Sequence, residues 1–359
     1  MASAPAPLPA IHFDAARWAR HRRTWDAFWK HELHRPIVVM ESRTWQAKDA
    51  LHQWNHLSAI NDAPTRIAER IHACLADTTF HGDAWPKQML NYGPGIVAGF
   101  LGGGVHGDGN TTWFTPGAFA GTDIGDWKFA IDPANPWWTK VQAVADAVIA
   151  RLGSHMTIGN TDLGGNLDIL ASLRTSEQLL LDCAERPDDV AARAAELTPL
   201  WIEYYRAMAA KLLAAGAGTS TWAPIWSPTT CYMLQSDFAY MISPRMFERF
   251  VLPDLAACCE ALDHGFYHLD GKGQIAHLDM LLSLERLRGI QWVPGDGQPP
   301  PEGWLPLLKR IVDAGKRCQL YVSPEGALTI VREIGGRGFA LAINRSMSEA
   351  EAHDFLHAV

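Results

Sequence analysis

The second half of the chain alternates between short apolar segments and amphipathic segments, and this alternation constrains the fold more than any other feature. Strand-like segments lie at 216–225, 265–269, 289–294, 318–323 and 339–344. Helix-like segments lie between or after them, beginning at Ser243-Pro244 and covering 277–287, 304–314 and 325–334, with a last one after a Ser348/Glu351 capping box. A strand, a helix and a second strand repeated in this order predict right-handed βαβ units and a parallel sheet.

The first half continues the same pattern less regularly. Strands are predicted at 36–41 and within 155–165, and helices at 14–30, 48–75, 134–152, 175–184 and 187–214. About eight strands then result, which favours an α/β fold of the (β/α)₈ barrel type over an open doubly wound sheet. We expect residues 1–30 to be a tail and a first helix, and 31–359 a single barrel. No G-x-G-x-x-G opens a helix after the first strand, which argues against dinucleotide binding.

Composition excludes several classes of protein. Hydrophobic residues make up 48% of the 359 residues, so the chain can bury a large core. The net charge of −8 argues against nucleic acid as the main partner, and no apolar run is long enough to span a membrane. The six cysteines include no C-x-x-C pair, so we expect reduced, buried thiols in a cytoplasmic protein.

Polar or aromatic residues stand at almost every predicted strand end. In a barrel the carboxyl ends of the strands converge on one face, where active sites are built. The predicted catalytic residues are His268, Asp270, Asp162 and Glu325. The predicted substrate-binding residues are Glu41, Arg43, Trp222, Asp237, Trp292, Asp296 and Asn344. The pattern favours an enzyme that acts on a small molecule.

The stretch HGFYHLDGKGQ contains the two candidates whose relative orientation can be predicted, His268 and Asp270. Alternate strand residues face the same side. His268 and Asp270 are therefore expected to point together into the mouth of the barrel, which is the face where the carboxyl ends of the strands converge. They can bind a metal such as zinc, act as an acid/base pair, or hydrogen-bond a substrate. Asp296 or Glu325 would supply further metal ligands. The alternative is a simple turn at Asp270-Gly271, with His268 incidental.

From about Gly159 onward the chain resembles the uroporphyrinogen decarboxylase superfamily, which includes the corrinoid-linked methyltransferases. The resemblance rests on GNTDLGGNLDILASLRTSEQLLLDCAERPDDV, on SDFAYMISPRMFERFVLPDL, and on HLDG followed by a helix. It implies a (β/α)₈ barrel with its active site at the carboxyl-end mouth, and it makes a homodimer plausible. For the methyltransferase branch it also implies bound zinc and a separate corrinoid protein as partner.

The chain departs from both branches at defined positions. Asp270 stands where the methyltransferases have a zinc-binding cysteine, and the late segment LAINRSMSEAE has no cysteine. The segment RPIVVMESRTWQ has only Arg43 near the strand end, where the decarboxylases have an arginine-rich motif. A His-plus-carboxylate site is harder and less thiol-seeking than a cysteine-rich site. Neither thiol methylation nor uroporphyrinogen decarboxylation is therefore expected.

Three functions remain open at this stage. The first is transfer or removal of a one-carbon group, methyl or carboxyl, on a small polar molecule. The second is a hydrolase or lyase that acts on a sugar-like substrate with two of Asp162, Asp270, Asp296 and Glu325. The third is a non-catalytic barrel that binds a small molecule. Carboxylates and indoles together are typical of sites for polar neutral or cationic ligands.

Overall fold

The computed structural model describes residues 10–43 and 60–359. The start of the predicted helix at 48–75 and most of the predicted tail lie outside these residues. The strands are β1 Ile37–Arg43, β2 Thr78–Gly82, β3 Lys87–Met89, β4 Gly104–Gly107, β5 Thr112–Thr115, β6 Thr157–Gly159, β7 Thr219–Ser220, β8 Trp226–Ser227, β9 Cys231–Leu234, β10 His264–Asp270, β11 Leu287–Val293, β12 Arg317–Val322 and β13 Phe339–Ile343.

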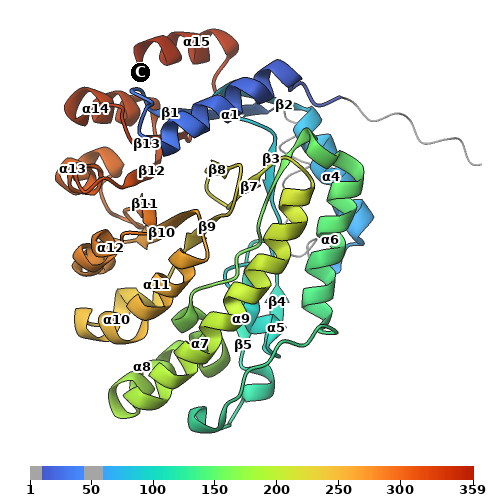
Figure 1. Cartoon of the computed structure of the whole chain (residues 1–359), viewed down its shortest axis with the longest axis vertical. Coiled ribbons are helices and arrows are strands. Elements are labelled where there is room, and N and C mark those ends of the chain that lie inside the picture. Colours follow the sequence, from blue (N-terminus) through green and yellow to red (C-terminus); the bar gives the residue numbers. More distant parts are fainter. Residues whose placement is uncertain (1–9, 44–59) are drawn as a thin grey trace, which may run out of the picture.

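Helices occupy most of the segments between the strands (Figure 1). They are α1 Ala15–Trp29, α4 Pro64–Ala76, α5 Val97–Phe100, α6 Pro136–Leu152, α7 Asn166–Arg174, α8 Ser176–Glu185, α9 Pro187–Ala214, α10 Pro244–Phe250, α11 Leu252–Glu260, α12 Leu278–Ser283, α13 Leu305–Asp313, α14 Pro324–Ile334 and α15 Glu349–Ala358. No helix in the described ranges is both long and apolar enough to cross a bilayer.

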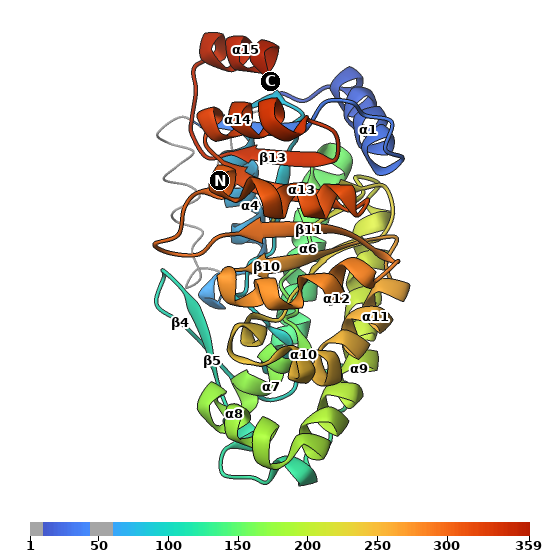
Figure 2. The ribbon, with the colours of Figure 1, turned by 90° about the vertical axis from the view of Figure 1, so that its left-hand side faces the viewer.

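The largest sheet has seven strands in the order β2-β1-β13-β12-β11-β10-β9. All its pairs are parallel except β1 with β2. Helices α12, α13 and α14 lie side by side against one face of this sheet (Figure 2). The predicted alternation of strands and helices in the second half of the chain is thus confirmed.

A second sheet has the order β3-β6-β7-β8, and β4 with β5 forms a separate hairpin. Strands β3, β6 and β7 are parallel, as in the larger sheet. Within the described residues no ladder joins β1 to β3 or β7 to β9, so hydrogen bonding does not join the two sheets into one cylinder. The fold is therefore a mixed α/β fold with mostly parallel strands, and closure of the barrel is not demonstrated.

Local sequence explains where several helices begin. Ser243, Ser323 and Ser348 each accept a backbone N–H at the start of α10, α14 and α15. A proline follows the first two serines directly, where its fixed φ suits the first helical turn. The predicted capping box of Ser348 and Glu351 is present. These signals end each strand-to-helix loop at a defined residue.

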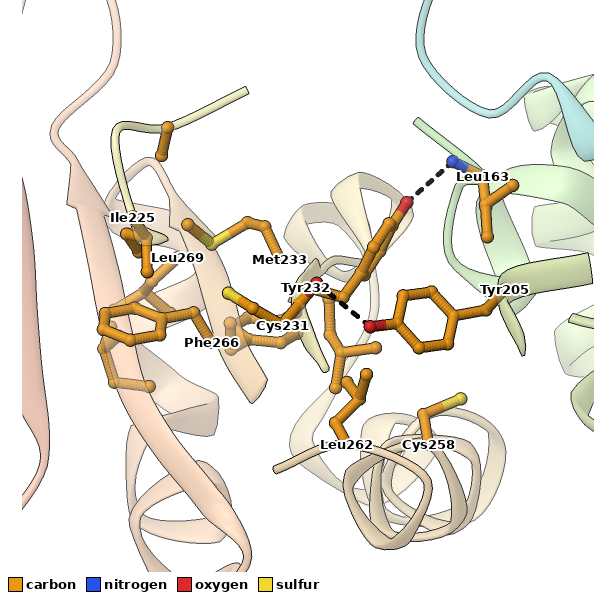
Figure 3. Packing of buried hydrophobic residues seen from close by; sticks show 14 of the residues in the cluster. Leu163, Tyr205, Ile225, Cys231, Tyr232, Met233, Cys258, Leu262, Phe266 and Leu269 are labelled. Atoms are coloured by element: carbon orange, nitrogen blue, oxygen red, sulfur yellow. Dashed lines mark hydrogen bonds between the residues drawn. The ribbon is translucent and has the colours of Figure 1, made fainter. Parts of the chain in front are cut away.

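Buried aromatic side chains join the two sheets (Figure 3). The backbone N–H of Leu163, in the loop after β6, donates to the Tyr232 hydroxyl of β9 over 2.7 Å. Tyr205 of α9 donates to the carbonyl of Cys231 over 3.2 Å. All four residues are buried. The end of β6 and the start of β9 are thereby held close together.

Clear differences from the sequence expectation lie between residues 216 and 287. The predicted strand at 216–225 is reduced to β7 and followed by the reversed strand β8. The predicted helix at 277–287 is only α12 after a 3₁₀ turn. Strand β9 was not predicted, because four apolar residues give no readable period. All six cysteines are free and buried, as expected.

Candidate functional site

The end of β10 places His268 and Asp270 on the same face of the sheet. The His268 Nε2 atom lies 3.8 Å from an Asp270 carboxylate oxygen. Only 16% of the His268 side chain is exposed, against 42% for Asp270, so the imidazole is the deeper of the two groups. The two side chains project together, as their spacing of two residues predicts.

Asp237 completes a cluster with these two residues. It follows β9, the neighbour of β10, at the first position of a 3₁₀ turn. One ligand atom from each of Asp237, His268 and Asp270 lies within 4.8 Å of the others. The turn is fixed by Asp168 of α7, whose carboxylate accepts the backbone N–H groups of Asp237 and Phe238 over 3.0 and 2.8 Å.

Two buried glutamines fix the orientation of the imidazole. His268, Gln291 and Gln319 stand opposite one another on β10, β11 and β12. Gln291 donates its Nε2–H to Gln319 Oε1 over 2.6 Å, which turns its own Oε1 toward His268 Nδ1 at 2.5 Å. The Trp222 indole N–H approaches the same oxygen at 3.4 Å.

This arrangement determines the tautomer of His268. An amide oxygen can only accept, so Nδ1 carries the proton and donates it to Gln291. The lone pair of the neutral ring is then on Nε2, the atom that faces the carboxylates. Metal-binding histidines in proteins are commonly held by such a bond on the other ring nitrogen.

Burial keeps the acidic groups around this cluster weakly acidic. Asp237 keeps solvent-exposed surface, and partial loss of hydration is the main cause that raises its pKa; His268 opposes this rise, and the charge of Asp270 adds to it. Burial also raises the pKa of Asp168, although the two N–H bonds that its carboxylate accepts act in the opposite direction. The buried Asp162 has a pKa raised to about 7 by burial, partly offset by a hydrogen bond from Gly164. Asp162 can therefore exchange a proton near neutral pH.

The donor set of the cluster suits a divalent metal ion. Two carboxylates and one neutral imidazole would balance the charge of a dication and leave coordination positions open. Three protein ligands with an open position are typical of catalytic rather than structural zinc sites. Oxygen-rich ligands also accept harder ions than a cysteine site does. The residues present thus fit a resident divalent ion.

A cavity of about 320 Å³ lies beside the cluster. Glu41 and Arg43 of β1, Lys87 of β3, and Trp222 line it, and Glu41 forms an ion pair with Arg43. The Trp222 ring meets the His268 ring edge to face, with centroids 5.7 Å apart, so Trp222 borders both the cavity and the cluster. Three predicted residues, Glu41, Arg43 and Trp222, are thereby brought to one place.

A cleft of about 470 Å³ borders the other side of the cluster. Asp237 and Asp168 line it together with Gln235 and with Trp113 and Phe114 from the β4–β5 hairpin. The hairpin lies at the side of the molecule toward which β11 runs (Figure 2). The cluster therefore opens into a concave region on the carboxyl-end side of the sheet.

A larger cavity of about 620 Å³ lies at the opposite, amino-terminal end of the strands. Its lining includes His264, Leu287 and Arg317, which are the first residues of β10, β11 and β12. Its buried cations are already bonded to backbone carbonyls, Lys316 to those of Leu284 and Leu287. In parallel α/β folds this end contributes stability rather than chemistry.

The remaining predicted residues lie apart from the cluster. Trp292 is fully buried and packs against Trp304, because it faces away from Gln291 on β11. Glu325 is exposed and bound to Arg345 over 3.0 Å. A hydrogen bond from its own backbone N–H, and after it the contact with Arg345, lowers the pKa of Glu325. Asp296 and Asn344 are exposed in loops after β11 and β13. Neither expected extra ligand, Asp296 or Glu325, belongs to the metal-ligand cluster; Asp237 takes that place.

Sequence reasoning missed the residues that support the cluster. Gln291 and Gln319 are fully buried within apolar strands, and a buried glutamine between apolar residues is the signal that would have identified them. Lys87 and Asp168 gave no comparable signal, because their positions depend on the packing of short irregular segments.

Comparison with known proteins shows a likeness in structure but not in sequence. No protein-family model and no curated protein matches the sequence. A solved structure of a methyltransferase from Methanosarcina mazei is similar to the chain with a TM-score of 0.62. The match covers 94% of this chain and 97% of the other, at 14% sequence identity. At that identity the likeness establishes a shared fold, that of a known methyltransferase.

Proposed function

We propose that this protein is an enzyme that transfers or removes a one-carbon group, most directly a methyl group, on a small polar molecule. The reaction would take place at the mouth of a (β/α)₈ barrel closed by packing between the two sheets. The observation that carries the proposal is the convergence of Asp237, His268 and Asp270, with His268 Nε2 free to bind a metal. The fold shared with a methyltransferase supports the reaction class.

Each residue of the site has a distinct part. Asp237, His268 and Asp270 would hold a divalent metal, which supplies Lewis-acid polarisation of a substrate oxygen or nitrogen atom. Gln291 holds the imidazole in the tautomer that this requires. With methylcobalamin as the methyl donor and cob(I)alamin as the leaving group, the substrate would lose a proton as it takes the methyl group. Asp162 would accept this proton, because its pKa of about 7 suits proton exchange at neutral pH. The β4–β5 hairpin and Trp222 limit access of water to the site.

Labelled methyl transfer tests the proposal. The zinc-loaded protein would be incubated with methylcobalamin carrying a labelled methyl group and with a mixture of small hydroxyl, amine, thiol and carboxylate acceptors. We expect label in at least one acceptor, and a rate at least about 100-fold lower for His268→Ala. Asp296→Asn, an exposed loop change, is the matched control and should transfer at the wild-type rate. Equal rates for the wild type and His268→Ala, or no labelled acceptor, would contradict the proposal.

The separation of the two carboxylates supports a second candidate. Oxygens of Asp237 and Asp270 lie within 4.8 Å of each other, close to the spacing of the carboxyl pair in retaining glycoside hydrolases. In that case the protein would be active without metal, and a chelator would leave its activity unchanged. Hydrolysis of aryl glycosides after chelation distinguishes this candidate from the first.

A further inference from the structure

The carboxylates and cations around the mouth are mostly paired with each other. Glu325 is bound to Arg345, and Glu41 is bound to Arg43. Asp162 is held in the interior by a bond from Gly164. Two cations line the 320 Å³ cavity: Arg43 is paired with Glu41, whereas Lys87 makes no ion pair with a carboxylate within residues 10–43 and 60–359.

Lys87 occupies an unusual place for a lysine. Its ammonium donates to the backbone carbonyl of Trp222 over 2.9 Å, which leaves two N–H groups for other acceptors. Burial lowers the pKa of Lys87 to about 8, with Arg43 acting in the same direction and Glu41 against it. Lys87 is half-buried, and an ammonium withdrawn from water in this way is costly unless an anion or a set of oxygen atoms compensates it.

The cavity has a net positive charge, which one negative group on a ligand would balance. Glu41 and Arg43 cancel, so protonated Lys87 leaves the cavity with a single positive charge. Trp85, Met89 and Pro224 supply apolar walls beside it. A single carboxylate attached to a small apolar body matches this charge and these walls, whereas a doubly charged phosphate would need more donors.

We propose that Lys87 binds a carboxylate group of the substrate in the cavity lined by Glu41, Arg43 and Trp222. That this ligand is the substrate rests on the proposed function; that a carboxylate binds there does not. Trp222 joins the two places, because its carbonyl accepts from Lys87 and its ring contacts His268. The reacting end of the molecule would then lie at the Asp237–His268–Asp270 cluster and its carboxylate at Lys87. The substrate is thus a small carboxylic acid rather than a neutral or cationic molecule.

Calorimetric titration of the metal-free full-length protein tests this binding. The probes are propionate, its neutral analogue propionamide, and inorganic phosphate. We expect propionate to bind with a Kd in the millimolar range, about 1 to 10 mM, and at least about tenfold more tightly than either of the others. Lys87→Met should weaken propionate binding at least about tenfold, and Lys87→Arg should weaken it less. Lys309→Met, on the outer face of α13, is the matched control and should bind as the wild type does.

The pH dependence of binding gives a second readout. A bound carboxylate stabilises the ammonium form of Lys87, so affinity is full below the pKa of the free protein and falls as pH rises through about 8. The neighbouring charged groups are Glu41, Arg43 and the thiol of Cys231. Burial raises the pKa of Cys231, so its thiol stays protonated between pH 6 and 9. We expect this fall in the wild type and none for Lys87→Arg.

Three results would overturn the inference. The first is an affinity for propionate that is unchanged in Lys87→Met. The second is an equal affinity of the wild type for propionate and propionamide, and the third is tighter binding of phosphate than of propionate. Unfolding midpoints of Lys87→Met and Lys87→Arg without ligand show that each variant is folded. Metal binding by the Asp237–His268–Asp270 cluster is measured separately, so failure of the carboxylate site and failure of the proposed function are distinguishable.

Discussion

His268 gains its orientation from an amide on the neighbouring strand rather than from the carboxylate two residues away. The Nδ1–H bond to Gln291 is 2.5 Å, whereas the approach of Nε2 to Asp270 is 3.8 Å. Gln319 in turn holds Gln291. The two glutamines that orient the imidazole are therefore buried, whereas the Nε2 side of the ring faces the carboxylate of Asp270.

Replacing Gln291 should test this support directly. In Gln291→Met the Nδ1–H loses its acceptor, so the ring is free to rotate or change tautomer, and zinc affinity is expected to fall about 10- to 100-fold. Gln291→Glu keeps an acceptor for Nδ1–H and should restore most of that affinity. Competition with a chromophoric chelator measures both.

A merely structural role for Gln291 would give another pattern. Unfolding midpoints would fall in Gln291→Met while the zinc affinity of the folded protein stayed the same. Equal zinc affinities for Gln291→Met and the wild type would contradict the orienting role.

At this scale the sequence identified the exposed members of the site better than the buried ones. His268 and Asp270 follow from a strand end and a spacing of two. Trp292 was selected as an indole near a strand end without considering alternation, and it faces the helices because Gln291 faces inward. Gln319 depends on the register of β11 with β12, which the sequence of one strand does not specify.

Strand β9 is the element that completes the site. It pairs with β10 in parallel and delivers Asp237 beside His268. Tyr232 in its middle accepts the backbone N–H of Leu163, which ties β9 to the loop that carries Asp162 (Figure 3). The position of β9 thus fixes both Asp237 and the loop that carries Asp162.

Removing the Tyr232 hydroxyl should destabilise this connection. In Tyr232→Phe the buried N–H of Leu163 loses its acceptor, and we expect the free energy of unfolding to fall by about 1–3 kcal/mol. Tyr205→Phe, which removes one donor to the Cys231 carbonyl, is the matched comparison and should cost about 0.5–1.5 kcal/mol. Urea unfolding measures both, and an unchanged midpoint for Tyr232→Phe would contradict the role assigned to this bond.

The elements that the sequence predicted are the ones with strong local signals. Helices α6, α9 and α14 and strands β10 to β13 lie within a few residues of their expected bounds. The hairpin β4–β5 and the short strands β7 to β9 were missed or misjudged, because their positions follow from pairing with distant segments rather than from their own composition.

The whole molecule combines a regular half with an irregular one. The seven-stranded sheet and its helices form a stable frame, and the smaller sheet with the hairpin shapes the mouth beside it. The likeness to the solved methyltransferase structure covers 94% of the chain, so both halves belong to the shared fold. The cluster of Asp237, His268 and Asp270 lies at strand ends and in a loop, where side chains can change without a change of fold.

The most direct measurement is the zinc content of the purified full-length protein after dialysis against a slight excess of the metal, together with that of three variants. One tightly bound ion per chain is expected in the wild type and in the control Asp296→Asn, and none in Asp237→Asn, His268→Ala or Asp270→Asn. Zinc retained equally by all three cluster variants, or absent from the folded wild-type protein, would contradict the account.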